Sequence, residues 1–216
     1  MRRPILLALP VLACIALAGC GGGKHSAGSP PAALLDPAKL TAQAPSLFTA
    51  TFKTTKGTFA VEVHRAWAPH GADRFYNLVK AGFFNGDEFF RVVPGFVVQF
   101  GISPYPQVST AWHAATIPDD PTVSHNTVGA VTFASAGPGT RTTQVFINLG
   151  SNKQLDANFA PFGTVTKGLA VVRKLYSGYG DAPTSQQGEM ETRGNAWLDK
   201  HYPKLDAIET ASVSRG

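Results

Sequence analysis

Short apolar runs rich in β-branched and aromatic residues recur along most of the chain and predict β-strands. Thr55-Lys56-Gly57 separates the first two runs and predicts a hairpin. Pro94-Gly95 separates a later pair and predicts a tight turn. The expected strands are 48–54, 58–63, 88–93, 96–100, 129–134, 144–148, 162–165 and 207–213.

Helical spacing of apolar residues is confined to short segments. It predicts a helix over 69–81 that begins near Pro69, and shorter helices over 168–176 and 195–201. The segments 101–126 and 177–194 show no such period and predict long loops, which often form binding surfaces. Many short strands, few helices and no βαβ alternation together predict an antiparallel barrel or sandwich with helices at its ends.

The chain begins with a pattern typical of export. Arg2 and Arg3 precede an uncharged apolar run over 5–18, which is shorter than the roughly 20 residues that span a bilayer. The run ends in Leu17-Ala18-Gly19-Cys20, which resembles the bacterial lipobox, whose cysteine receives a diacylglycerol and becomes the new N-terminus. We therefore expect a lipoprotein signal peptide over 1–19 and lipidation of Cys20. An ordinary signal peptide with an incidental cysteine is the alternative.

The expected anchor divides the chain into a linker and one domain. Residues 20–46 are rich in Gly, Ala, Pro and Ser and predict a lipidated, flexible tether. Residues 47–216 form the expected domain, held by its lipid to a membrane of the bacterial cell envelope, on the extracytoplasmic side. Both cysteines, Cys14 and Cys20, precede this domain, so it is expected to contain no disulfide.

Composition narrows the possible partners. Hydrophobic residues make up 44% of the chain and charged residues 15%, which is enough apolar material for a core. The net charge of +5 is spread along the sequence rather than clustered, so we expect no nucleic-acid partner. We expect a monomer.

Three stretches carry the candidate chemistry. Arg91 lies inside an apolar strand, where an arginine either meets a carboxylate or faces a cleft. Strict alternation places it on one face with Phe89 and Val93, and places Phe90 and Val92 on the other. By themselves, the phenylalanines of these stretches could be core residues and the glutamines exposed strand residues. The stretches are FFRVVPGFVVQ (89–99), FASAGPGTRTTQVFI (133–147) and LDANFAPFG (155–163).

In order and spacing, these stretches resemble the cyclophilin family of peptidyl-prolyl cis-trans isomerases. The resemblance runs from about Ala50 to the C-terminus. It implies a mostly β fold, a closed eight-stranded antiparallel barrel capped by two helices, to which the sequence adds a third short one near the C-terminus. It also implies isomerisation of Xaa-Pro bonds in proline-containing polypeptides, here envelope proteins, without metal or cofactor.

The resemblance also assigns the site. It implies catalytic roles for Arg91 and Gln99 in a shallow groove on the outside of the barrel. The groove's other implied residues are Phe96, Val97, Ala134, Ser135, Ala136, Gln144, Phe146, Leu155 and Phe159.

The sequence departs from the pattern common in eukaryotic members at four positions. Phe90 and Phe159 stand where a histidine is usual, Ser135 where asparagine is common, and Gln154 where many members have tryptophan. Arg91 is retained, so activity is expected. Because the missing tryptophan contributes to drug binding in the family, we expect weak inhibition by cyclosporin.

Other classes of function have less support. A hydrolase lacks its Gly-x-Ser-x-Gly elbow, and the scattered histidines show no spacing for a triad or a zinc site. A catalytically weak chaperone or scaffold that binds proline-containing segments would use the same pocket residues, so it stays open.

Overall fold

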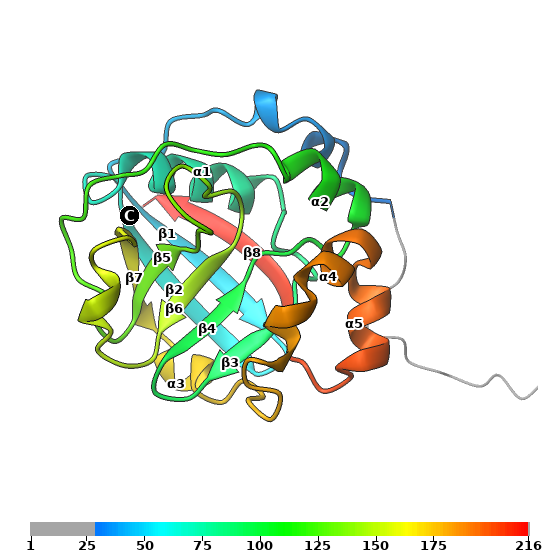
Figure 1. Cartoon of the computed structure of the whole chain (residues 1–216). Helices are drawn as coiled ribbons and strands as arrows, with labels where there is room; N and C mark the ends of the chain where they lie inside the picture. Colours follow the sequence, from blue (N-terminus) through cyan, green and yellow to red (C-terminus); the bar gives the residue numbers. More distant parts are fainter. Residues whose placement is uncertain (1–28, 216) are drawn as a thin grey trace, which may run out of the picture.

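The computed structural model describes residues 29–215, which form one curled antiparallel sheet with helices around it (Figure 1). The strand order is β3-β4-β6-β5-β7-β2-β1-β8. The eight predicted strands are present with shifted ends. They are β1 (Leu47–Thr54), β2 (Gly57–His64), β3 (Arg91–Val93), β4 (Val97–Phe100), β5 (Ala130–Phe133), β6 (Val145–Asn148), β7 (Pro161–Lys167) and β8 (Ile208–Arg215).

The two edge strands, β3 and β8, do not pair along their length, so the sheet is open and the predicted closed barrel is not confirmed. The segments next to them approach each other at one point. An isolated bridge joins Glu88 to Ala207, and the N–H of Phe89 donates to the carbonyl of Asp206 at 2.9 Å. These contacts bring the start of β3 close to the C-terminal segment without making a ladder.

The structure has more helices than the two or three expected. The predicted helix over 69–81 is present as α1, and the one over 195–201 as α5, but the helix expected over 168–176 is a single turn, α3. Each segment predicted as a long loop contains a helix instead, α2 in one and η4 and α4 in the other. The helices are η1 (Ala32–Leu35), η2 (Pro37–Lys39), α1 (Pro69–Lys80), α2 (Pro106–Trp112), η3 (Lys153–Leu155), α3 (Leu169–Val172), η4 (Ala182–Gln186), α4 (Gln187–Arg193) and α5 (Asn195–His201).

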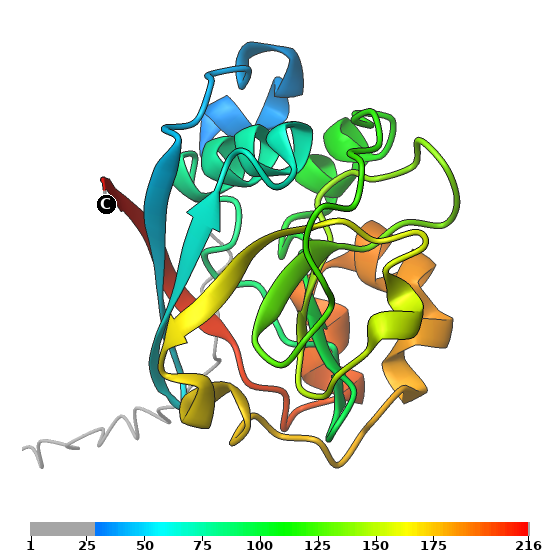
Figure 2. The same cartoon turned by 90° about the vertical axis from the view of Figure 1, so that its left-hand side faces the viewer.

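The segment before β1 packs across α1 and α2 (Figure 2). Leu34 is 1% exposed, and its carbonyl accepts a hydrogen bond from the indole N–H of Trp112 at 2.8 Å. Asn77 of α1 donates to the carbonyl of Ala42 and accepts from its N–H. The prediction of a flexible tether over 20–46 is therefore wrong for the described part of that segment. Residues 1–19 and Cys20 lie outside the described residues.

Two hydrophobic clusters hold these elements together. The main core, inside the curled sheet, is rich in phenylalanine, and the smaller cluster lies under α4 and α5. Phe89 belongs to the main core and Phe90 to the smaller cluster, because β3 begins only at Arg91. The predicted alternation, with Phe89 on the face of Arg91, is therefore wrong. No helix among residues 29–215 is long and apolar enough to cross a membrane.

Candidate functional site

Arg91, Gln99 and Phe146 lie in one row across three neighbouring strands. The turn at Pro94-Gly95 sets the register of the β3–β4 hairpin so that Arg91 pairs with Gln99, and β4 pairs Gln99 with Phe146 of β6. Directly paired residues of an antiparallel sheet project from the same face. Nη1 of Arg91 donates to Oε1 of Gln99 at 3.3 Å. Strand register alone therefore assembles three of the predicted site residues.

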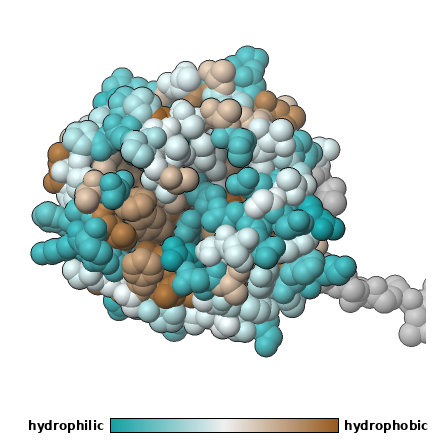
Figure 3. Space-filling model, in the orientation of Figure 1, coloured by the Kyte–Doolittle hydropathy of each residue, from teal (hydrophilic) through white to brown (hydrophobic). Residues whose placement is uncertain are grey.

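An apolar pocket of about 300 Å³ lies beside this row. The rings of Phe146 and Phe159 meet edge to face within it, with centroids 5.6 Å apart. The guanidinium carbon of Arg91 lies 5.3 Å from the ring centroid of Phe96, a cation–π contact at the rim. Figure 3 shows hydrophobic surface on this face next to hydrophilic surface. The pocket is lined by Arg91, Phe96, Val97, Gln99, Ala134, Ser135, Phe146, Leu155, Phe159, Thr184 and Gln187.

A chain of polar side chains runs along the pocket. At one end, Nε of Arg91 lies 2.5 Å from Oδ1 of Asp181. Beyond Arg91, Nε2 of Gln99 donates to Gln144 at 2.9 Å, and Nε2 of Gln144 donates to Gln187 at 3.0 Å. Gln99 and Gln144 each accept a hydrogen bond from one neighbour and donate one to the next, so the orientation of both amides is defined by their neighbours.

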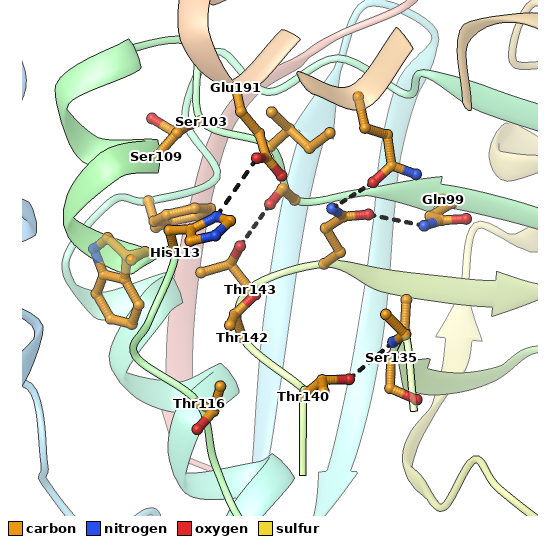
Figure 4. A pocket seen from close by; sticks show the side chains of 18 residues that line it. Gln99, Ser103, Ser109, His113, Thr116, Ser135, Thr140, Thr142, Thr143 and Glu191 are labelled. Carbon is orange, nitrogen blue, oxygen red and sulfur yellow. Dashed lines mark hydrogen bonds and ion pairs between the residues drawn. The ribbon is translucent and has the colours of Figure 1, made fainter. Parts of the chain in front are cut away.

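A polar pocket of about 470 Å³ adjoins the apolar one and shares Gln99, Ala134, Ser135 and Gln187 with it (Figure 4). Its walls come from α2, α4 and the loop between β5 and β6. Glu191 of α4 faces His113 at one end, with 3.8 Å between Oε2 and Nδ1. The two pockets form a continuous groove, apolar at one end and rich in hydroxyl and amide groups at the other.

Arg74 of α1 ties two walls of the polar pocket together. Its Nη1 donates to the carbonyl of Ala115 at 2.6 Å and to that of Thr142 at 3.1 Å. Burial, with a smaller contribution from the charge of Arg141, lowers the pKa of Arg74 to about 10. The side chain is therefore still a cation at neutral pH and donates from a fixed position.

A buried amide network fixes the far wall of the apolar pocket. Asn126 is fully buried; its side-chain amide donates to Asp156 Oδ1 at 2.9 Å and to the carbonyl of Phe159 at 2.8 Å. Burial alone would raise the pKa of Asp156, but hydrogen bonds from Asn126 and His125 outweigh it, so the pKa lies below its ordinary value. Asp156 and Phe159 flank the turn that carries the pocket wall, so the network sets the position of that wall.

Comparison with known proteins identifies the family. Residues 49–194 match the family described as cyclophilin type peptidyl-prolyl cis-trans isomerase/CLD. The chain belongs to this family. It is 32% identical to the peptidyl-prolyl cis-trans isomerase ppi1 of Schizosaccharomyces pombe, over 57% of this chain and 81% of that protein. It is also 32% identical to a peptidyl-prolyl cis-trans isomerase of the bacterium Acinetobacter baylyi, over 75% of this chain and 85% of that protein.

Solved structures show the same fold. A cyclophilin type peptidyl-prolyl cis-trans isomerase of Cryptosporidium parvum superposes with a TM-score of 0.58 at 17% identity, over 79% of this chain and 99% of that one. A second structure of that protein, determined in the presence of the dipeptide Ala-Pro, also has a TM-score of 0.58, over 78% of this chain. These structures confirm the mostly β cyclophilin fold predicted from the sequence, and the family match and the relatives above confirm the predicted isomerase class.

The structure brings the predicted cyclophilin site residues together in one groove. All but two line the apolar pocket, and the exceptions, Ala136 and Gln144, line the polar pocket next to it. Ala134 and Ser135 face both pockets. The roles given to these residues stay predictions, since geometry places them without testing them.

Asp181, Thr184 and Gln187 are site residues that the sequence does not predict. They belong to 177–194, where the only signal was a long loop of the kind that forms binding surfaces.

Two departures from the family pattern also have a structural setting. Phe90 packs in the smaller hydrophobic cluster, and Gln154 is exposed on η3, next to Leu155 of the apolar pocket.

Proposed function

We propose that this cyclophilin isomerises Xaa-Pro bonds by hydrogen bonding from Arg91 to the prolyl nitrogen while the apolar pocket holds the proline ring. One observation carries the proposal: the guanidinium is fixed over Phe96, at the rim of the pocket. The Ala-Pro dipeptide present with the Cryptosporidium parvum relative supports the substrate class. The pocket of about 300 Å³ is ample for a pyrrolidine ring.

The chemistry of the amide explains why a fixed cation accelerates the rotation. The barrier of about 18–20 kcal/mol reflects conjugation between nitrogen and carbonyl. In the twisted transition state that conjugation is lost, and the nitrogen becomes a better hydrogen-bond acceptor. A donor aimed at the nitrogen therefore binds the twisted form more tightly than either planar form. An acceleration of ~10⁵ needs about 7 kcal/mol of such differential binding.

The two hydrogen bonds that Arg91 makes among the described residues do not use the required donor. Arg91 uses Nε toward Asp181 and Nη1 toward Gln99, and neither bond occupies Nη2. Gln99 supports the arginine from the next strand, so it orients the donor rather than reacting itself. Rotation breaks no covalent bond, so the mechanism needs no nucleophile.

An exchange assay tests this proposal. The cis–trans rate of a short Xaa-Pro peptide is measured by NMR or by a protease-coupled assay for wild type, Arg91→Ala and Arg91→Lys. We expect a large loss of kcat with Ala and incomplete recovery with Lys, because an ammonium lacks the planar fork. A wild type that binds the peptide without a rate above background would instead favour the scaffold function. Full activity in Arg91→Ala would contradict the mechanism.

We further propose that the domain acts outside the cytoplasm, on envelope proteins, from a lipid anchor at Cys20. The support is the export pattern over 1–19 and the lipobox-like Leu17-Ala18-Gly19-Cys20. Mass spectrometry of the mature N-terminus in a bacterial host tests this. We expect a diacylglyceryl group on Cys20 and release of Cys20→Ala from the membrane fraction. Unmodified Cys20 in a membrane-bound protein would overturn it.

A further inference from the structure

The segment between α3 and α5 contacts both ends of the chain of polar side chains formed by Arg91, Gln99 and Gln144. Asp181, just before η4, contacts Arg91 at one end of the polar chain, and Gln187, at the start of α4, accepts from Gln144 at the other. η4 lies against β3, the strand that begins with Arg91 (Figure 1). Residues only six positions apart therefore contact both ends of a polar chain whose members come from β3, β4 and the loop before β6.

The backbone of this segment is itself anchored. Met190 of α4 is 0% exposed and belongs to the smaller hydrophobic cluster together with Phe90, the residue before Arg91. At the other end, the carbonyl of Asp181 accepts from the N–H of Thr184 at 2.9 Å and from its hydroxyl at 2.6 Å. The carboxylate of Asp181 thus projects from a closed turn on a packed support.

A second arginine–aspartate pair in the same protein shows what is distinctive about this one. Arg65 uses both Nε and Nη2, at 2.7 and 2.8 Å, to grip the two oxygens of Asp73 as a closed fork. Arg91 gives Asp181 only Nε. The Arg65 pair engages both nitrogens on one edge of the guanidinium. The Arg91 pair engages Nε alone, so Asp181 holds the guanidinium while Nη2 can donate to another acceptor.

We propose that Asp181 is a positioning residue for Arg91, holding its Nε edge so that Nη2 is presented to the prolyl nitrogen. The proposal rests on the role given to Arg91 above. Three contacts then restrain the guanidinium from different sides: Asp181 at Nε, Gln99 at Nη1 and the ring of Phe96 against the plane. Without Asp181 the guanidinium is freer to rotate away from the groove, and the donor is less often in place when the amide twists.

Kinetics of Asp181→Ala and Asp181→Asn test the proposal in the full chain. Because Asp181 acts through Arg91, we expect Ala to lower kcat about five-fold with KM changed less than about two-fold, a loss equivalent to about 1 kcal/mol. Asn keeps an oxygen that accepts from Nε, so it should retain more than half of the wild-type kcat. Glu189→Gln is the matched control, since Glu189 pairs with Arg193 on the same segment away from both pockets. It should leave both constants unchanged.

A spectroscopic readout separates this inference from the proposed function. The Nε–H signal of Arg91 is observed by ¹⁵N NMR without substrate. We expect it to be resolved and slowly exchanging in wild type and in Asp181→Asn, and averaged with free arginine signals in Asp181→Ala. An unchanged signal, an unchanged or increased kcat, or a loss confined to KM in Asp181→Ala would each overturn the proposal. If wild type shows no turnover but the Nε–H signal of Arg91 behaves as expected, the catalytic role proposed for Arg91 is overturned, whereas the positioning of Arg91 by Asp181 is supported.

Discussion

Asp120 and Arg141 form a buried ion pair beneath the loop that walls the groove. Nη2 of Arg141 lies 3.0 Å from Oδ2 of Asp120, and the two side chains are 5% and 0% exposed. The same carboxylate accepts from the backbone N–H groups of His70 and Gly71, each at 2.9 Å, at the start of α1. Asp120 therefore connects the start of α1 to the loop between β5 and β6, which walls the groove.

Removing one partner of this pair should destabilise the fold strongly. Asp120→Ala removes one of the two carboxylates that pair with the buried Arg141 guanidinium and leaves two helix N–H groups without an acceptor, so we expect a loss of about 3 kcal/mol in the free energy of unfolding. Urea denaturation followed by circular dichroism measures it. Asp36→Ala is the control, because its ion pair with Lys39 is exposed and should contribute nothing measurable. Equal unfolding midpoints for Asp120→Ala and wild type would contradict the assignment.

The amide network around Asn126 should matter for both stability and substrate binding. Asn126→Ala removes the donors to Asp156 and to the carbonyl of Phe159, and we expect it to lower the free energy of unfolding by about 3 kcal/mol. Because the turn carrying Phe159 then loses its support, KM for an Xaa-Pro peptide should rise. Asn158→Ala, an exposed residue of the same turn, should change neither quantity. A normal KM in a folded Asn126→Ala variant would show that the network does not position the pocket.

The sequence predicts the parts of the site that depend on local pattern. Pro94-Gly95 fixes a tight turn, and counting outward from Gly95 by equal steps pairs Arg91 with Gln99. Asp181 is different, because it approaches Arg91 from 90 positions away in sequence. Its contact depends on how α4 packs on Phe90. α4 has only seven residues, too few for a helical period to identify it.

The packing of the segment before β1 also could not be predicted from the sequence. Its Gly, Ala, Pro and Ser content is typical of linkers, and composition does not show that one leucine within it is buried in the core of the domain. Leu34 is that residue, and its backbone carbonyl also accepts from Trp112. Local composition predicts a flexible segment because it contains no information about distant contacts. In the structure the segment packs on α2, a helix about 75 residues further along the chain.

Leu34 should therefore contribute to the stability of the domain. Leu34→Ala opens a cavity beside Trp112, and we expect a loss of about 2–4 kcal/mol in the free energy of unfolding, with a shift in tryptophan fluorescence. The neighbouring Leu35 is 47% exposed and gives a matched control, because Leu35→Ala removes the same atoms from a site without a core contact. Equal losses in the two variants would mean that the segment is not packed on the domain in solution.

The buried carboxyl of Asp87 should make stability fall as pH rises. Burial raises the pKa of Asp87 well above its ordinary value of 3.8, and the Glu88 carboxyl raises it further, while the N–H of Gly101 lowers it by less. Between its unfolded and folded pKa, the folded state keeps a proton that the unfolded state has lost. The free energy of unfolding therefore decreases with increasing pH from about 4 upward.

Asp87→Asn should remove this dependence, since an amide has no proton to lose. We expect a flatter profile of urea-unfolding free energy between about pH 4.5 and 7, and higher stability than wild type at the upper end. Asp73 supplies the opposite case: burial would raise its pKa, but hydrogen bonds from Arg65 and the N–H of Ala44 outweigh it and lower the pKa. The stability it contributes is present above about pH 4 and is lost as the pH falls further, so Asp73→Asn should alter the acid side of the profile. If Asp87→Asn kept the wild-type slope of unfolding free energy against pH above pH 4.5, the proton responsible would belong to another group and the assignment to Asp87 would be wrong.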